Sequence, residues 1–283
     1  MKRIIRVFPR RTRWTPDDEH VAVNRGPELF DDYDLAHISV AFSFDKECAF
    51  QLFDMWMKHC ETRIGGPAFN VQGFDFEPGL YLKKGAVITS RGCPRNCWFC
   101  SVPKREGNDV RELPIRDGWN IFDDNLLRCS ESHVRGVFEM LKRQSKPATF
   151  SGGLEAAVLH DWHIDLFERA RVKRMFFAYD TPDDYEPLIA AGQMFQKSRL
   201  FSVEYLNCYV LVGYPGDTLE KAEKRCLQCL DAGFMPFAML YADDNGRRQD
   251  ADWRKFQKVF ARPAIVKARF LKGKPLGQDR RAD

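Results

Sequence analysis

The stretch GAVITSRGCPRNCWFC, residues 85–100, decides the fold that this sequence predicts. It begins as a short apolar run typical of a buried strand and continues into a loop that carries Cys93, Cys97 and Cys100. From here to about residue 243, strand-like runs alternate with longer segments of helical period, which is the pattern of βα units around a parallel sheet. We therefore expect an α/β fold in which the cysteine loop follows the first strand of that sheet.

Six strand-like runs can be distinguished in this part of the chain. They are GAVITS (85–90), WNIFDD (119–124), ATFSGG (148–153), RMFFAYD (174–180), NCYVLVGY (207–214) and MPFAMLYAD (235–243). Between them, helices are expected to begin near Ser132, near Asp183 and at Asp217 or Thr218. Six βα units are too few for a closed eight-stranded barrel but suit a partial (β/α)6 TIM-like barrel, with function at the carboxyl ends of the strands.

The segments on either side of these units read differently. The N-terminal segment carries strand-like and helical runs of its own, which predicts a small α/β unit. Near the C-terminus, Trp253, Phe256 and Phe260 follow helical spacing, so we expect an amphipathic helix that packs against the barrel, followed by a basic tail. The predicted domains are residues 1–80, 81–250 and 251–283.

Composition excludes several classes of protein. The chain has 283 residues, 44% of them apolar, which is enough for a full core and argues against disorder. It contains neither an apolar run of membrane-spanning length nor a signal-peptide core, so we expect a cytoplasmic protein without a membrane partner. The net charge of +4 permits a nucleic-acid partner without indicating one, and the nine cysteines indicate metal binding or buried thiols rather than disulfides.

The spacing C-x3-C-x2-C brings three thiols into one loop. Thiolates are soft ligands that select zinc, copper(I) or an iron–sulfur cluster. A structural zinc needs four ligands, and the next candidates, Cys129 and His133, lie beyond the second predicted strand. A cubane cluster on three cysteines leaves one iron open for a small molecule. A zinc-stabilised nucleic-acid-binding protein and an iron–sulfur electron carrier that binds no such small molecule remain as alternatives.

With Phe99 in the aromatic position, the pattern C-x3-C-x-aromatic-C resembles the signature of the radical S-adenosylmethionine (SAM) superfamily. The resemblance extends over about residues 85–243, because the six βα units resemble that family's partial barrel. It implies a [4Fe-4S] cluster on the three cysteines, with SAM on the open iron. Reductive cleavage would give methionine and a 5′-deoxyadenosyl radical that acts on an unidentified substrate, and a donor such as flavodoxin or ferredoxin would supply the electron.

The same resemblance implies contacts to SAM at the carboxyl ends of the other strands. In FDDN, Asp123 or Asp124 would meet the methionyl amino group, although the run also fits a turn or helix cap. Phe99 is an expected cofactor contact within the signature itself. In SGGLEA, Gly152 and Gly153 would let the ligand approach the backbone and Glu155 would bind the ribose hydroxyls, while Gly213, Tyr214 and Pro215 are expected near the adenine. In YDTPDD, Tyr179 and Asp180 are expected at the mouth of the barrel, where either could contact substrate or SAM.

Two further motifs are not assigned a function. Cys226 and Cys229 form a second C-x2-C, but their helical spacing predicts core packing. Residues 1–80 resemble a truncated cobalamin-binding domain, of the kind found in radical SAM proteins of phage and prophage genomes. Asp18-Glu19-His20 begins that domain's Asp-x-His-x-x-Gly motif, but Val23 stands in place of the glycine, so we expect no cobalamin.

Overall fold

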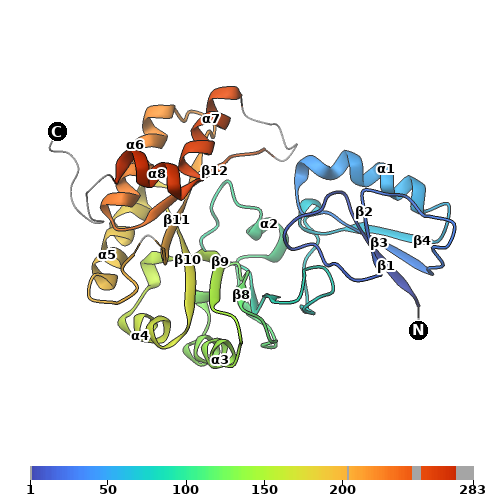
Figure 1. Cartoon of the computed structure of the whole chain (residues 1–283), viewed down its shortest axis with the longest axis horizontal. Helices are drawn as coiled ribbons and strands as arrows, with labels where there is room; N and C mark the ends of the chain where they lie inside the picture. Colours follow the sequence, from blue (N-terminus) through green and yellow to red (C-terminus); the bar gives the residue numbers. More distant parts are fainter. Residues whose placement is uncertain (1, 203, 244–249, 272–283) are drawn as a thin grey trace.

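The computed structural model describes residues 2–202, 204–243 and 250–271 and places them in an α/β fold with two parallel sheets (Figure 1). A four-stranded sheet of order β2-β1-β3-β4 forms the N-terminal unit, and a six-stranded sheet of order β12-β11-β10-β9-β8-β5 forms the larger unit. Each has its own cluster of buried apolar side chains. The predicted α/β class is confirmed.

The N-terminal unit is one parallel sheet covered by a single long helix. In each element the apolar residues recur with the period of that element and so lie on one face. Ala49, Leu52 and Trp56 of the helix therefore pack in one cluster with Ile5 and Ile38 of the sheet. The elements are β1 (Ile4–Phe8), β2 (Val21–Val23), β3 (Leu35–Ser39), the 3-10 turn η1 (Ser43–Asp45), α1 (Lys46–Trp56), β4 (Glu61–Gly65) and η2 (Pro67–Phe69).

In the six-stranded sheet, each strand lies beside its predecessor along the chain. Its strands are β5 (Ala86–Val87), β8 (Asn120–Ile121), β9 (Ala148–Leu154), β10 (Val172–Ala178), β11 (Leu206–Val212) and β12 (Met235–Leu240). The first strand is shorter than predicted because residues 90–91 leave the sheet. They form β6 (Ser90–Arg91), which pairs antiparallel with β7 (Arg111–Glu112).

Four helices follow one another around the outer side of this sheet (Figure 1). They are α3 (Glu131–Lys142), α4 (Asp161–Arg169), α5 (Tyr185–Phe195) and α6 (Leu219–Asp231). Thr218 caps α6 as one of the two predicted caps, since its side chain accepts a hydrogen bond from the Lys221 backbone. The predicted cap Ser132 is wrong: Ser130 caps α3 by accepting from the His133 backbone, and Ser132 lies inside the helix.

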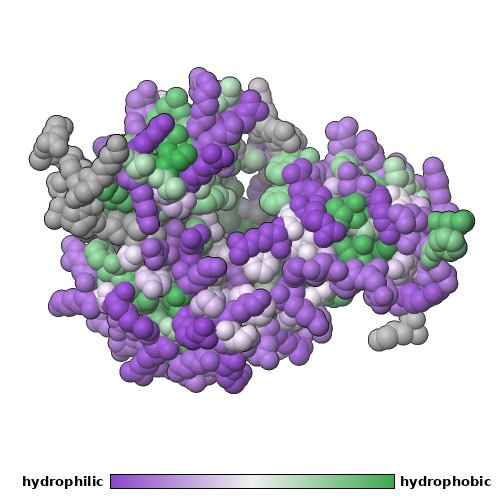
Figure 2. All heavy atoms as spheres, viewed as in Figure 1, coloured by the Kyte–Doolittle hydropathy of each residue, from purple (hydrophilic) through white to green (hydrophobic). Residues whose placement is uncertain are grey.

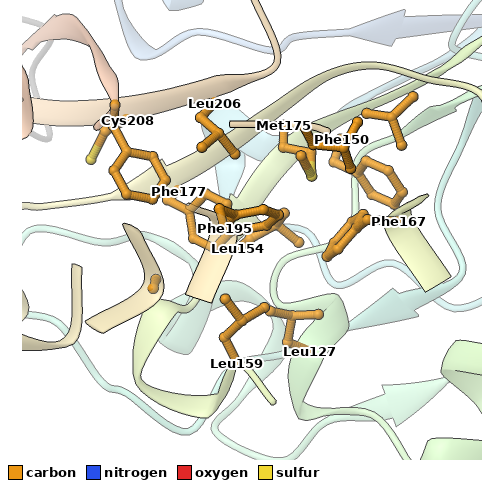
Figure 3. Packing of buried hydrophobic residues seen from close by; sticks show 14 of the residues in the cluster. Leu127, Phe150, Leu154, Leu159, Phe167, Met175, Phe177, Phe195, Leu206 and Cys208 are labelled. Carbon is orange, nitrogen blue, oxygen red and sulfur yellow. The ribbon is translucent and has the colours of Figure 1, made fainter. Parts of the chain in front are cut away.

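The main core lies between the sheet and these helices. Phe138 of α3, Phe150 of β9 and Phe167 of α4 pack with ring centroids 5.1 to 5.6 Å apart. Figure 3 shows Phe150, Met175 and Phe177 of the sheet together with Phe167 and Phe195 of the helices. The apolar side chains that carried the strand and helix predictions are therefore those that hold the layers together.

The C-terminal helices α7 (Ala251–Phe260) and α8 (Pro263–Phe270) belong to the same core. Phe260 is buried between Phe256 and Phe270, and Trp253 packs at the edge of the cluster. The predicted packing of this amphipathic helix is confirmed. Residues 272–283, which hold most of the predicted basic tail, lie outside the described part of the chain.

The other C-x2-C pair also behaves as predicted from its spacing. Cys226 and Cys229 are fully buried on α6 and face Cys208 of β11 within the core. Burial raises the pKa of the Cys226 thiol well above its usual range. The pair therefore acts as small apolar side chains in this structure.

The two units meet along a narrow strip and leave a hollow between them (Figure 2). Arg6 of β1 donates hydrogen bonds to the carbonyl oxygens of Gly79 and Leu80, at 3.1 and 2.8 Å. Trp14 packs edge-on against Phe122, which follows β8, with ring centroids 5.3 Å apart. In the described residues, no helix combines the length and apolar character needed to span a membrane.

Candidate functional site

The cysteine loop leaves the carboxyl edge of the six-stranded sheet directly after β5 and β6. Gly92 opens it with a φ of +88°, and an added Cβ there would lie 2.1 Å from the Asp109 carbonyl oxygen. Asn96 also adopts a left-handed conformation, with φ +47°. The Cys100 backbone N–H then donates to the Cys97 carbonyl at 3.0 Å and closes the turn. These local constraints fold three cysteines into one compact loop.

All three thiols are partly buried and lie within one another's electrostatic reach. Burial is the main cause that raises the pKa of Cys97 and Cys100, and the neighbouring thiols of the loop raise it further. The Asn125 amide donates to Cys93 Sγ at 3.3 Å, and the Val102 backbone N–H donates to Cys100 Sγ at 3.5 Å. The Val102 hydrogen bond acts to lower the pKa of Cys100 and so partly counteracts its burial.

Within residues 2–202, 204–243 and 250–271, no three His, Cys, Asp or Glu side chains come close enough together to hold one metal ion. The three cysteines of the loop are included in this finding. One zinc ion binds its sulfurs at roughly 2.3 Å and needs them nearly in contact, whereas the thiolates of an iron–sulfur cluster bind different irons. The arrangement therefore gives no support to a single-ion site.

Asp123, directly after β8, anchors the start of the cysteine loop. Its buried carboxylate accepts hydrogen bonds from the Thr89 backbone, from Thr89 Oγ1 and from Ser90 Oγ, at 2.6, 2.6 and 2.8 Å. Burial raises the pKa of Asp123, and these hydrogen bonds counteract it. Cys129, the remaining cysteine of this region, lies against Ser90, and burial raises its pKa to about 12.

Asp124 holds the next part of the same loop. Its carboxylate accepts from the Gly92 backbone N–H at 2.9 Å and from Arg105 at 3.2 Å. Burial raises the pKa of Asp124, while the Gly92 and Arg105 contacts lower it. Both aspartates of the FDDN run thus hold the cysteine loop in position. Their carboxylates, which we expected to meet the methionyl amino group, are engaged by residues of the protein itself.

A buried carboxylate that the sequence analysis missed holds the far end of the loop. Glu106, the last residue of α2 (Val102–Glu106), is surrounded by Arg91, Arg105 and Arg111 at 3.2, 2.9 and 2.7 Å. It also accepts from the Gly73 backbone N–H. Three arginines on one buried carboxylate tie the cysteine loop to the β6–β7 hairpin. In the sequence, the role of Glu106 was indicated only by the charged residues that cluster around the loop.

Glu155, at the end of β9, lies beside the loop and is fully engaged. Arg128 binds both carboxylate oxygens at 2.8 and 2.5 Å, and the Asn125 amide donates at 2.7 Å. Arg95, from between the first two cysteines, approaches Glu155 to 3.9 Å and Asp184 to 2.7 Å. Burial acts to raise the pKa of Glu155, but the Arg128 and Asn125 hydrogen bonds outweigh it and lower the pKa.

The two glycines before Glu155 differ in their surroundings. A Cβ on Gly152 would lie 2.0 Å from the Asp123 carbonyl oxygen, so this residue allows the close approach of β9 to the end of β8. A Cβ on Gly153 would meet nothing within 4 Å. Only Gly153 therefore borders open space in which a ligand could approach the backbone.

The two catalytic candidates after β10 point to opposite sides. Tyr179 is buried in the core, where its hydroxyl donates to Gln228 Oε1 of α6 at 2.9 Å and its ring stacks on Tyr185. It does not lie at the mouth, because side chains alternate between the two faces of a strand. Asp180 accepts from the Leu211 backbone at 2.9 Å, close to Arg95, and burial raises its pKa to about 7.

The end of β11 reaches the cysteine loop through aromatic contacts. Gly213, with φ +75°, approaches the Trp253 ring so closely that a Cβ would lie 3.1 Å from it. Tyr214 meets Trp98 of the loop edge-on at 5.7 Å between centroids, and Trp98 also meets the expected aromatic residue Phe99 at 5.4 Å. Pro215, the next residue, is exposed. The predicted adenine-side residues are thus brought beside the cysteines.

Asn125 is the second residue that the sequence analysis missed. It follows the two aspartates and links Cys93 to Glu155 through its amide, while its Oδ1 is buried and has no hydrogen-bond partner among the described residues. An orphaned buried acceptor is costly and indicates a site for a donor. Its place in the FDDN run was visible, but its role depends on contacts that the sequence does not reveal.

Comparison with known proteins adds no assignment: no protein-family model matches the chain, and no curated protein matches it significantly.

Proposed function

We propose that this chain is a radical SAM enzyme that binds a [4Fe-4S] cluster on Cys93, Cys97 and Cys100 and reductively cleaves S-adenosylmethionine. The observation that carries the proposal is one loop of three interacting, partly buried thiols at the carboxyl edge of a parallel sheet. The sequential order of the six strands agrees with the partial (β/α)6 TIM-like barrel that we expect, since a doubly wound sheet would reverse its order.

The donor set fits such a cluster. Three thiolates would leave one iron of the cluster without a protein ligand. The buried Asn125 Oδ1, whose amide nitrogen contacts Cys93, has no hydrogen-bond donor among the described residues. The ammonium group of a methionyl moiety would satisfy this oxygen, so we place Asn125 at that end of the ligand, while Asp124 holds the loop through Gly92 and Arg105. When bound, the cluster supplies the electron that splits SAM into methionine and a 5′-deoxyadenosyl radical.

Neighbouring strand ends would orient the rest of SAM. Glu155 can accept hydrogen bonds from ribose hydroxyls only if it exchanges one of its contacts with Arg128. Gly153 leaves room for the ligand against the backbone, and Tyr214 offers a flat surface beside Trp98 for the adenine. Asp180, with a pKa near neutrality, can hold or release a proton at the substrate side.

The experiment is anaerobic reconstitution with iron and sulfide, followed by reduction in the presence of SAM and detection of 5′-deoxyadenosine. Cys93→Ala, Cys97→Ala and Cys100→Ala should each lose the cluster and the product. Cys226→Ala is the matched control, because that thiol is buried in the core, and it should retain both. A protein that binds zinc instead, or that binds a cluster without cleaving SAM, would refute the proposal.

A further inference from the structure

The carboxyl edges of both sheets border the hollow between the two units, which Figure 2 shows. The segment after β1 carries Trp14 onto Phe122, and Phe122 directly precedes the aspartates that hold the cysteine loop. The edge of the N-terminal sheet is therefore adjacent to the proposed SAM site. A substrate that reaches the site through this hollow would contact both edges.

On the N-terminal side, this edge presents aromatic rings to solvent. Phe42, which follows β3, is 42% exposed, and Phe44 is 40% exposed. Their rings stack with centroids 5.1 Å apart and planes only 6° from parallel. Phe50 of α1 is also exposed and meets Phe69 edge-on at 5.7 Å. Exposed aromatic rings that lie next to one another are typical of a binding site, whereas apolar side chains scattered singly over a surface are not.

Cations accompany these rings. The Arg13 guanidinium lies 5.1 Å from the Trp14 ring, and the Lys46 ammonium lies 5.5 Å from the Phe69 ring. Arg10 lies over Phe44 at 4.8 Å but is bound to Asp45, so its charge is offset. Across the part of the chain that the structure describes, Arg13 and Lys46 form no ion pair with a carboxylate. The edge therefore carries positive charge that is open to an anionic partner.

The larger unit contributes a further ring from the cysteine loop itself. Trp98 is 58% exposed although it lies directly beside Cys97. Tyr214 and Tyr241 flank it, each with a centroid distance of 5.7 Å. Flat aromatic surfaces thus occur at both edges, and cations occur next to those of the N-terminal sheet.

We propose that the hollow binds single-stranded nucleic acid, whose bases stack on Phe42 and Trp98 while Arg13 and Lys46 contact phosphates. Phe44 supports the Phe42 ring from its other face and is itself covered by Arg10. This inference rests on the proposed function, since it names the substrate class of that same site. Exposed rings with cations beside them match the two parts of a single strand, its unstacked bases and its phosphates. An acidic peptide would match the cations but not the flat surfaces, and a duplex keeps its base faces stacked inside.

The test measures binding of a fluorescein-labelled single-stranded oligonucleotide, about 12 nucleotides long, by anisotropy over a series of salt concentrations. The full-length protein is used with its cluster reconstituted. The double variant Phe42→Ala/Phe44→Ala should bind about tenfold more weakly or worse, because it removes the Phe42 platform together with the ring that supports it. Lys46→Gln should weaken binding and reduce the slope of log K against log salt by about 0.7.

Matched controls come from the opposite end of α1. Phe30 is 92% exposed and Lys58 is exposed, and the contact of His59 with the Asp31 carbonyl places both near that end. Phe30→Ala and Lys58→Gln should bind the oligonucleotide as the unaltered protein does. Equal losses in these controls would overturn the inference, and so would equally tight binding of an acidic peptide or of a duplex.

Binding and SAM cleavage are scored separately, so the two proposals can fail independently. The Phe42→Ala/Phe44→Ala variant should still form 5′-deoxyadenosine in the absence of substrate, because neither ring lies in the cysteine loop. Cleavage without oligonucleotide binding would overturn the inference and leave the proposed function intact. Oligonucleotide binding without any cleavage would overturn the proposed function, and with it the role of the oligonucleotide as substrate, but not its binding in the hollow.

Discussion

The substitution Gly152→Ala tests whether Gly152 is required for the close packing of two strands. Gly152 lies in β9 where this strand passes the end of β8, and a Cβ there would lie 2.0 Å from the Asp123 carbonyl oxygen and 3.0 Å from its carbonyl carbon and backbone nitrogen. Contacts below 3.0 Å do not occur for real Cβ atoms. Because both partners are backbone, no side chain can rotate away, and the strands must separate by about 1 Å.

The cost can be worked out from this contact. Overpacking a tight interior typically destabilises by about 1–3 kcal/mol, and the lower chain entropy of unfolded alanine returns about 0.4–1 kcal/mol. The net loss for Gly152→Ala is therefore about 1.3 kcal/mol, which corresponds to a melting temperature roughly 3–5 °C lower. Since Asp123 anchors Thr89 and Ser90, the displacement would also loosen the cysteine loop.

Gly153→Ala is the matched control, because its Cβ would meet nothing within 4 Å. It should leave the melting temperature within about 2 °C of the unaltered protein, yet weaken SAM binding if the ligand approaches this backbone. Thermal unfolding by circular dichroism and equilibrium binding of SAM to the reconstituted protein measure the two effects. If Gly152→Ala unfolded at the unaltered temperature, the reasoning from strand contact would be refuted.

Three further substitutions test the surroundings of the site. Asp180→Asn should stabilise the protein by about 4 kcal/mol at pH 8 and by about 1 kcal/mol at pH 4.5 in denaturant titrations. A folded-state pKa of about 7 makes ionisation of Asp180 oppose folding as the pH rises from about 4 to 7. An equal effect at both pH values would contradict this. Glu106→Gln should cost about 3 kcal/mol and reduce the iron retained after gel filtration, because three arginines lose a buried partner; unchanged iron content would argue against its role in holding the loop. Phe260→Ala should cost about 3–5 kcal/mol in the same titrations, because it empties a buried ring site, whereas an independent C-terminal extension would tolerate it.

Periodicity predicted most of the larger unit, because its apolar residues are spaced as its elements require. The long strands β9 to β12 lie where apolar runs occur, and Thr218 begins α6 as one of two adjacent candidates. Ser130 and Ser132 are equally good caps in isolation, and only the tertiary position of the helix start chooses between them. The strands β6 and β7 were not predicted, since two-residue pairing is too short to leave a periodic signal.

The sequence predicted which strand ends lie close together, but not the contacts among the residues that follow them. Residues after five of the six strands gather at one edge because the strands are parallel, as the alternation of elements predicts. Tyr179 was misplaced because the last residue of a strand can face either side, and its bond to Gln228 spans 49 positions of sequence. Asn125 and Glu106 were missed because their significance lies in partners that are distant along the chain.

The support of the cysteine loop follows a consistent physical logic. Its start is bound by Asp123, its first turn by Asp124 and its end by Glu106, so that buried carboxylates fix each part of it. Such carboxylates lose much solvation on burial and persist only where several donors compensate them. Because three such carboxylates act on one short loop, the surrounding residues fix the position of that loop. Under the proposed function, a loop that is already held in place would lose little further entropy on binding the cluster.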